Sequence, residues 1–342
     1  MLSATKMKKK VTIKTVAEKS GVSISVVSRV LNGKTEQFRI SETTAKRVRE
    51  VAKALNYRPS ELARGFRLKK SFSLGLVFPT IKNPFFAEMA SMLIEEARKR
   101  GYFILIADGE EDPKLEEKAV NLFHDRGIDG LFILPGSKHN DYLEDLYSNG
   151  FPIVFIDRHV KKSKIPYVGT DNYKGAFEAI SYLLKKGHRK IACIQGTRHA
   201  ISTQERLRAY SELMEKTHNT TQWAVGSSFT EENGYIQTKR LLSSREKPTA
   251  IFAMNNLIAF GVVKAVRELG FNIPKDISLI TFDDHKLLSY ISPPVTAVAP
   301  SKSAIIEMAM NVMIAQVEGK IIAQKRLEFP VSLLVRNSVK KL

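Results

Sequence analysis

Several residues that could bind a small molecule come after short apolar runs of the chain. Carboxylates and an arginine can bond hydroxyl groups, amides can both donate and accept, and aromatic rings can stack on the apolar face of a sugar ring. This combination is typical of a site for a polyhydroxylated ligand. The candidates are Asn83, Phe85, Phe86, Asp157, Arg158, Arg206, Asn255, Asn256, Asp283 and Asp284.

Each of these candidates also has a purely structural interpretation. Asn83 could cap the helix that follows it, Phe85 or Phe86 could belong to the core, and Asp283 could cap the next element. The residues alone leave both interpretations open.

Short apolar runs alternate with segments of helical period from residue 73 onward. Continuous apolar strands that alternate with helices predict parallel sheets with helices on both faces, and about 270 residues of this kind favour two lobes. Ligands bind beyond the carboxyl ends of such strands, so the candidates should meet in a cleft. We expect strands at 74–79, 103–108, 131–135, 153–157, 190–195, 250–255 and 277–283, and helices at 86–100, 113–126, 173–186, 206–216, 257–269 and 303–318.

The net charge of +19 is concentrated at the N-terminus. Residues 1–70 hold 18 Lys and Arg against 5 Asp and Glu, a local balance of +13. A concentrated positive field attracts polyanions, and nucleic acid is the most common of them. A solvated basic tail is the alternative that charge alone leaves open.

Residues 12–57 carry the pattern of three short helices. Apolar residues at helical spacing stop at Gly21, Ser23 can cap a second helix, and a third helix is expected from Ser41 to Leu55. This order predicts a helix-turn-helix unit. The expected buried residues of its second and third helices are Val26, Val27, Val30, Leu31, Ala45, Val48, Val51, Ala52 and Leu55.

The second helix of such a unit can lie in the major groove of DNA. Serine can bond several base edges, isoleucine can contact a thymine methyl group, and arginine can bond guanine or hold a phosphate. A helical bundle without a nucleic-acid role is the alternative, which the local charge disfavours. The outward residues expected to read bases are Ile24, Ser25, Ser28 and Arg29.

The string VTIKTVAEKSGVSISVVSRVLNG at residues 11–33, followed by residues 39–71, resembles the start of LacI/GalR (lac repressor) family transcription regulators. The resemblance continues through GLVFPTIKNPFFAEM, GTDNYKGA, GHRKIACIQG, PTAIFAMNN and ISLITFDD. It implies a sequence-specific DNA-binding dimer controlled by a small molecule. The expected domains are a helix-turn-helix domain (1–57), a hinge (58–70) and a periplasmic-binding-protein-like effector domain (71–342), with lobes at about 71–167 with 298–326 and 168–297 with 327–342.

The resemblance also implies roles for residues around the DNA. Expected contacts to the DNA backbone are Thr12, Lys14, Ser23, Asn32, Arg39 and Tyr57. In the family two hinge helices pair in the minor groove, and an apolar side chain, usually leucine, enters the central base step. The corresponding hinge residues here are Ala63, Arg64, Phe66 and Arg67, with Phe66 at the wedge position.

The hinge is too short to form a stable helix alone, because isolated helices under about 12 residues are marginal in water. We therefore expect a segment that becomes ordered only when something packs on it. Packing of Phe66 against the larger domain, away from DNA, is the alternative.

The resemblance assigns effector contacts to Asn83, Phe86, Asp157, Arg206, Asn256 and Asp283, and places Phe229 in the aromatic wall of the pocket. A ligand that bridges the lobes favours the closed form and so can control the hinge. Besides Phe66, three features depart from the family. Thr15 replaces a usual acidic residue, the loop at Lys34–Phe38 is about three residues longer, and Asn256 stands where aspartate is common, which weakens the implication of a neutral sugar.

The remaining patterns exclude several classes of protein. The chain has no G-x-G-x-x-G after its first strand, no G-x-x-x-x-G-K-[ST] and no H-E-x-x-H, so we expect no enzyme activity, catalytic residue, cofactor or metal site. One cysteine fits a reducing compartment, and the polar N-terminus and short apolar runs predict no signal peptide and no membrane segment. The resemblance then implies a bacterial cytoplasmic protein, associated with the nucleoid through its operator. The expected partners are a pseudo-palindromic operator in double-stranded DNA, a carbohydrate effector and a second copy of the chain in a homodimer. A periplasmic-type solute-binding protein and a non-specific architectural DNA-binding protein are the alternatives.

Overall fold

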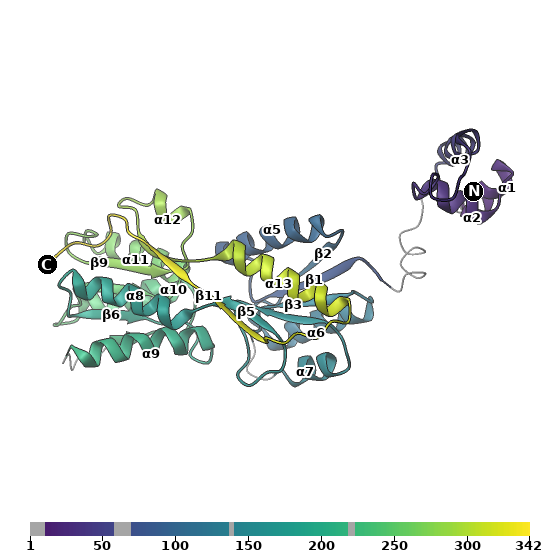
Figure 1. Cartoon of the computed structure of the whole chain (residues 1–342). Helices are drawn as coiled ribbons and strands as arrows, with labels where there is room; N and C mark the ends of the chain where they lie inside the picture. The colour runs from purple at the N-terminus through teal and green to yellow at the C-terminus, as the bar shows by residue number, and fades with distance from the viewer. Residues whose placement is uncertain (1–10, 58–69, 137–139, 218–222) are drawn as a thin grey trace, which may run out of the picture. The chain divides into compact units, whose positions relative to one another are not determined.

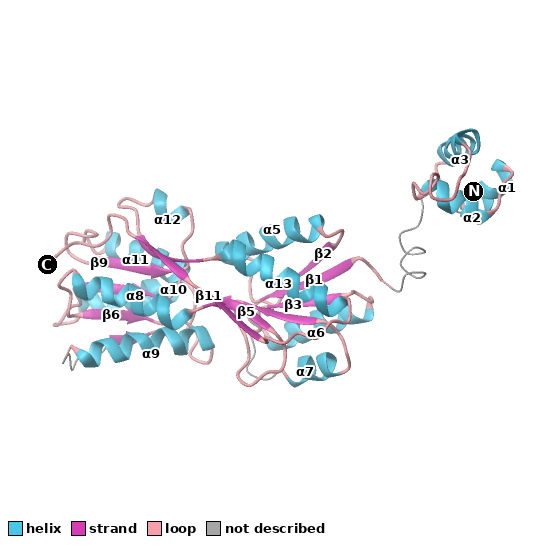
Figure 2. Cartoon of the chain, viewed as in Figure 1, coloured by secondary structure: helices cyan, strands magenta, loops and turns pink. Residues whose placement is uncertain are grey.

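The computed structural model describes residues 11–57, 70–136, 140–217 and 223–342. Two compact units divide between Ser71 and Phe72 (Figure 1). The first is helical, and the second combines strands and helices (Figure 2). The predicted hinge residues Ala63, Arg64, Phe66 and Arg67 lie outside the described residues.

Three helices form the N-terminal unit: α1 (Ile13–Ser20), α2 (Ile24–Leu31) and α3 (Glu42–Ala54). Gly21 ends α1 in the left-handed conformation, with a φ of 66°, and its N–H donates to the last carbonyls of that helix. Ser23 then caps α2, because its Oγ accepts a hydrogen bond from Val26 N at 3.3 Å. The predicted helix-turn-helix is confirmed.

The three helices enclose one small core. Its buried members are Val16, Ala17, Val27, Val30, Ala45, Val48 and Ala52, with Val26, Leu31, Val51 and Leu55 partly buried against them. The helical period therefore identified the inward residues of α2 and α3 correctly.

The first lobe of the larger unit contains a six-stranded parallel sheet in the order β11-β5-β4-β3-β1-β2. Helices α5 and α13 cover one face, where Leu74 and Leu76 are buried, and α6 and α7 cover the other, where Val77 is buried. The elements are β1 (Ser73–Phe78), α5 (Pro84–Lys99), β2 (Phe103–Asp108), α6 (Pro113–Asp125), β3 (Gly130–Ile133), α7 (Asp141–Ser148), β4 (Ile153–Ile156), β5 (Tyr167–Thr170), α13 (Lys302–Val317) and β11 (Arg326–Phe329).

The second lobe contains another six-stranded sheet, in the order β12-β10-β9-β8-β6-β7. Its strands are parallel except β12, which runs antiparallel to β10. The elements are α8 (Asn172–Lys185), β6 (Ile191–Ile194), α9 (Ile201–Lys216), β7 (Trp223–Val225), α10 (Glu231–Ser243), β8 (Ala250–Ala253), α11 (Asn256–Glu268), β9 (Ser278–Phe282), α12 (Leu287–Tyr290), β10 (Thr296–Pro300) and β12 (Val331–Leu334). Two lobes with mainly parallel sheets confirm the predicted fold class.

The chain crosses between the lobes slightly later than predicted. Strand β5 still pairs in the first sheet up to Thr170, β10 pairs in the second up to Pro300, and β11 pairs in the first up to Phe329. The expected limits, at about 167, 297 and 326, each fall three residues before the end of these strands, because strand pairing holds each segment in its sheet to the end of the strand. Helix α9 also begins earlier than predicted, at Ile201, which puts Arg206 in its second turn.

None of the helices in the described ranges combines the length and apolarity that spanning a membrane requires.

Candidate functional site: a pocket between two lobes and an exposed helix

A polar pocket lies where the two lobes meet, beyond the ends of several strands. The first lobe supplies its lining through the loops after β1 and β4, and the second through α9 and the loops after β7, β8 and β9. The lining residues are Asn83, Phe86, Asp157 and Arg158 from the first lobe, and Ser202, Arg206, Phe229, Asn255 and Asp283 from the second.

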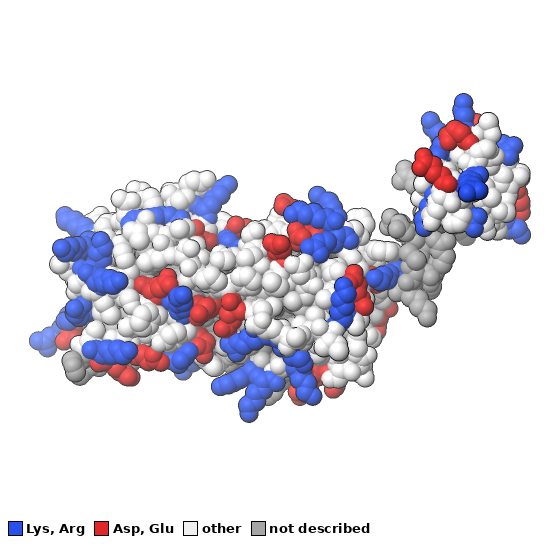
Figure 3. Space-filling model, viewed as in Figure 1, with Lys and Arg blue, Asp and Glu red and all other residues white. Residues whose placement is uncertain are grey.

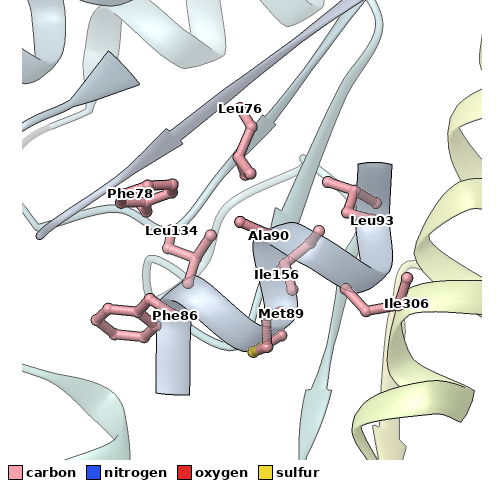
Figure 4. A pocket seen from close by; sticks show the side chains of 9 residues that line it. All are labelled: Leu76, Phe78, Phe86, Met89, Ala90, Leu93, Leu134, Ile156 and Ile306. Atoms are coloured by element: carbon pink, nitrogen blue, oxygen red, sulfur yellow. The ribbon is translucent and has the colours of Figure 1, made fainter. Parts of the chain in front are cut away.

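Asn83 and Phe86 come from the start of α5. The Asn83 Oδ1 accepts a hydrogen bond from Phe85 N at 3.0 Å, so Asn83 caps the helix and lines the pocket at once. Both of its proposed interpretations are therefore compatible. Phe86 borders the pocket and also a small apolar cavity whose other walls include Leu134 and Met89 (Figure 4). The Phe86 ring thus separates the polar pocket from the first-lobe core.

Arg158 spans the pocket between two aromatic rings. Its guanidinium carbon lies 5.4 Å from the ring centroid of Phe86 in the first lobe and 5.4 Å from that of Phe229 in the second. Two of its nitrogens donate to the carboxylate of Glu111 at 3.2 Å each. A paired cation therefore sits between apolar walls from both lobes.

Phe229 is held in place by close packing on a glycine. A Cβ atom added to Gly196, in the loop after β6, would lie 2.1 Å from Phe229 Cε1. Only glycine leaves room for this ring, so the second-lobe aromatic wall depends on a residue outside the pocket lining.

Arg206 is the most firmly tied side chain of the pocket. It is 3% exposed, and its Nε donates to Asn172 Oδ1 at 2.9 Å. One terminal nitrogen donates to the Met254 carbonyl, and the other lies 3.4 Å from Asp283 Oδ1. The guanidinium carbon also lies 3.5 Å from the ring centroid of Phe282. Arg206 therefore neutralises a buried carboxylate and joins α9 to the ends of two strands.

Two carboxylates face each other from the two lobes. Asp157 follows β4 with a φ of 59°, and Asp283 follows β9 with a φ of 65°. Aspartate tolerates this left-handed region better than most residues, and such conformations gather at functional sites. Burial, together with the charge of Asp283, raises the pKa of Asp157 to about 6, although Arg206 and Arg158 oppose the shift. Burial likewise raises the pKa of Asp283.

The lining side chains leave little free space. The cavity among them measures about 10 Å³, which is the room one water molecule needs. A ligand of sugar size therefore requires the lobes to separate or the side chains to rearrange on entry.

Two predicted effector contacts, Phe85 and Asn256, do not line the pocket in this structure. Phe85 is 1% exposed and belongs to the first-lobe core, with its ring 5.7 Å from that of Phe86, because the turn of α5 points the two rings apart. Asn256 is fully buried, and neither polar atom of its side chain has a hydrogen-bond partner. The neighbouring Asn255, in extended conformation as the cap of α11, lines the pocket instead.

Ser202 is the lining residue that the sequence pattern did not indicate. It lies in the first turn of α9, before the position at which the helix was expected to begin. No cap residue marks that start, since Ala200 occupies the cap position and makes no side-chain hydrogen bond. A signal for Ser202 was therefore missing from the local sequence.

In the N-terminal unit, the outward face of α2 is open. Ile24 is 47% exposed, Ser25 and Arg29 are exposed, and Ser28 is partly buried. Lys and Arg side chains lie over the visible face of this unit, with Asp and Glu among them (Figure 3). All four predicted base-reading residues thus lie on one short helix, whose opposite face is packed in the core through Val27 and Val30.

The residues predicted to contact the DNA backbone have various places in this unit. Thr12 caps α1, accepting from Thr15 N at 3.4 Å, and the Asn32 amide donates to the Ser28 carbonyl at 2.6 Å. Tyr57 packs at the edge of the core, and burial raises its pKa. The others are exposed: Lys14, Ser23 and Arg39.

Comparison with known proteins identifies both units. Residues 12–60 match the model of bacterial regulatory proteins of the lacI family, and residues 180–339 match a periplasmic binding protein-like domain. The chain is 33% identical over 339 residues to the HTH-type transcriptional regulator DegA of Bacillus subtilis, covering 97% of this chain and 99% of that protein. It is 28% identical over 334 residues to the HTH-type transcriptional repressor PurR of Mannheimia succiniciproducens, with coverage of 97% and 99%.

The fold agrees with a solved structure of the lac repressor dimer bound to operator and the anti-inducer ONPF. The TM-score is 0.86, with 23% identity and coverage of 97% of this chain and 100% of that one. These relatives are transcriptional regulators, not enzymes. The chain has a helix-turn-helix unit, a two-lobed unit with a pocket between the lobes, and similarity to these regulators along almost its whole length. This protein therefore belongs to the LacI family of DNA-binding transcriptional regulators.

Proposed function

We propose that this protein is a repressor whose affinity for an operator is controlled by a small molecule bound between its two lobes. The observation that carries the proposal is the lining of the pocket, to which both lobes contribute charged or polar side chains. A ligand that touches both walls binds the closed arrangement better than an open one, and it shifts the equilibrium by that difference in affinity. The protein would act in the bacterial cytoplasm, where the DNA lies.

The chemistry of the lining supports a carbohydrate or a sugar derivative as the effector. Asp157, Asp283 and Asn255 offer acceptors for hydroxyl groups, and Phe86 and Phe229 offer ring faces from opposite lobes.

The DNA-binding part of the proposal assigns the major groove to α2. Its base-reading residues are Ile24, Ser25, Ser28 and Arg29, and the contacts of Thr12, Lys14, Ser23, Asn32, Arg39 and Tyr57 to the DNA backbone complete the interface. Control would pass through residues 58–70, where Phe66 is proposed to enter a minor-groove base step.

A homodimer is the proposed state on DNA, because a pseudo-palindromic operator presents two half-sites. Strand β2 supports this assignment. It forms the end of its sheet, and Phe103, Leu105 and Ile106 on it are 66%, 37% and 40% exposed. We propose that a second copy covers this apolar edge. Phe103→Glu should convert the dimer to a monomer in sedimentation velocity. Leu122→Glu, at a 48% exposed position of α6, should not.

The proposal is tested first by selecting duplexes from a random library with the full-length protein. Enrichment of a two-fold symmetric sequence supports specific operator binding; uniform recovery of all sequences would show a non-specific DNA-binding protein instead.

The effector is then sought by thermal shift with sugars, sugar phosphates and nucleobases, because a ligand of the folded state raises the melting temperature. A stabilising compound should change the affinity for the selected duplex about 5- to 150-fold. Ser202→Ala should reduce that change without altering affinity in the absence of the compound. Ser211→Ala, on the same helix outside the pocket lining, is the matched control. A compound that binds but leaves operator affinity constant would contradict effector control.

A further inference from the structure

The loop after α2 is a folded turn that carries an aromatic side chain. Gly33 leaves the helix with a φ of 70°, and Lys34 N donates to the Arg29 carbonyl at 2.9 Å. Within the turn, Phe38 N donates to Lys34 O at 3.3 Å, and Ile40 N donates to Thr35 O at 3.0 Å. These hydrogen bonds fix the backbone of the loop at Lys34–Phe38, which is about three residues longer than in the LacI family.

The loop brings Phe38 against a residue of the DNA-reading helix. The guanidinium carbon of Arg29 lies 3.9 Å from the ring centroid of Phe38. This distance is well within the range of cation–π contacts. Phe38 remains 40% exposed and is not part of the small core of this unit.

The contact leaves the hydrogen-bonding edges of Arg29 available. Within the described residues, its guanidinium makes no side-chain hydrogen bond or ion pair. An arginine stacked by its face on a ring keeps its planar fork of N–H donors free, and its rotamer freedom is reduced before any partner arrives. A guanidinium held in this way is suited to bidentate recognition of guanine O6 and N7 in the major groove.

We propose that Phe38 is a positioning residue that fixes Arg29 for reading one guanine in each operator half-site. The inference rests on the proposed function, since it requires α2 to lie in the major groove. It extends that function by assigning a specificity role to the loop, through a side chain that lies outside the recognition helix. Arg29 contacts the base, and Phe38 acts only through Arg29.

The role of Phe38 predicts a particular pattern of base preference. Loss of a cation–π contact at an exposed site corresponds to about a two- to five-fold change in an equilibrium constant. Phe38→Leu should therefore weaken preference at one base pair of each half-site by about that factor and leave preference at the other positions unchanged. The affected base pair should be the one at which Arg29→Lys also loses discrimination.

The experiment measures binding of the full-length protein to the duplex selected by the wild type and to single-base variants of it. Phe38→Tyr keeps a ring face and should restore the preference, whereas Phe38→Leu should not. The double variant Phe38→Leu with Arg29→Lys should lose no more discrimination at that base pair than Arg29→Lys alone, because both changes remove the same interaction. Thermal melting of each variant checks that the unit remains folded.

Three outcomes decide the matter. Loss confined to the Arg29 base pair, with rescue by tyrosine, supports the proposal. An equal loss at all positions, or unchanged preference in Phe38→Leu, would overturn it. If the wild-type protein enriches no sequence, the proposed operator binding fails first, which distinguishes that failure from a failure of the Phe38 assignment.

Discussion

We propose that the outward face of α2 and the pocket between the lobes each bind a partner. Their side chains differ in burial and in the number of contacts they make with the rest of the protein. Ile24, Ser25 and Arg29 on α2 are exposed, and Arg29 makes a cation–π contact with Phe38. In the pocket, Arg206 and Asp283 are nearly fully buried and bonded to neighbours.

The difference has a physical cause. Side chains that contact DNA are solvated in the free protein, where an unpaired charge has little effect on the free energy of folding. Their hydrogen-bond partners are supplied by the duplex. Charged side chains in a closed pocket lack that solvation and must be paired within the protein. The comparison teaches that the same kind of substitution should mainly change affinity at α2 but should also change stability in the pocket.

The largest effect on stability is expected from Arg206→Ala. The change leaves Asp283 buried without its cation, which typically costs about 3–5 kcal/mol in the free energy of unfolding. Urea denaturation of the full-length protein would measure the loss. Arg208→Ala, two residues along α9 and 52% exposed, should change stability by no more than about 1 kcal/mol. Equal losses of unfolding free energy in Arg206→Ala and Arg208→Ala would show that the buried arginine of the pocket contributes no more to stability than an exposed one.

The second effect concerns the support of the aromatic wall. Gly196→Ala places a methyl group within the ring of Phe229, so we expect a cost of about 1–3 kcal/mol and displacement of that ring. Gly109→Ala is the control, since the nearest atom to its added Cβ would be 3.4 Å away, an ordinary contact. The two denaturation midpoints should differ clearly. A neutral Gly196→Ala variant would mean that Phe229 moves freely.

A smaller effect should appear with pH. Because the pKa of Asp157 is raised from 3.8 to about 6, the folded protein holds this proton at pH values where the unfolded chain has lost it. The folded protein is therefore favoured at low pH, and its stability falls as pH rises from about 4 to about 6. Asp157→Asn should remove this part of the pH dependence, measured by urea denaturation between pH 4.5 and 7.5.

Asp125→Asn, with an 80% exposed carboxylate on α6, is the control for that measurement and should keep the wild-type profile. A wild-type profile in Asp157→Asn would show that Asp157 titrates normally in solution.

The smallest effect on stability is expected on α2. Arg29→Ala should change the free energy of unfolding by less than about 0.5 kcal/mol, as surface substitutions usually do. Its affinity for the selected duplex should nevertheless fall by about 5- to 150-fold, the value of one good bidentate base contact. Fluorescence anisotropy at a stated salt concentration measures the second quantity. If Arg29→Ala lost stability but kept its affinity for the duplex, α2 would behave as we expect of the pocket, and the contrast between the two regions would be wrong.

Local patterns predicted much of this molecule. Gly21 and Ser23 marked the turn between α1 and α2 because each acts on its own backbone, and the apolar spacing of α3 identified its buried side. The same reasoning failed at α9, where Ala200 gives no capping signal, and Ser202 was missed as a result. The strand-end pattern named both Asn255 and Asn256, and the family resemblance favoured Asn256; in the structure Asn255 is the one that lines the pocket.

The sequence by itself determined the helix-turn-helix unit, the two α/β lobes and seven of the pocket residues, because periodicity, caps and strand ends are properties of short segments. Only the tertiary structure decided that Arg158 lies between rings from both lobes, that Arg206 pairs with Asp283, and that Phe38 meets Arg29. These contacts depend on how segments meet in space, which no local pattern records.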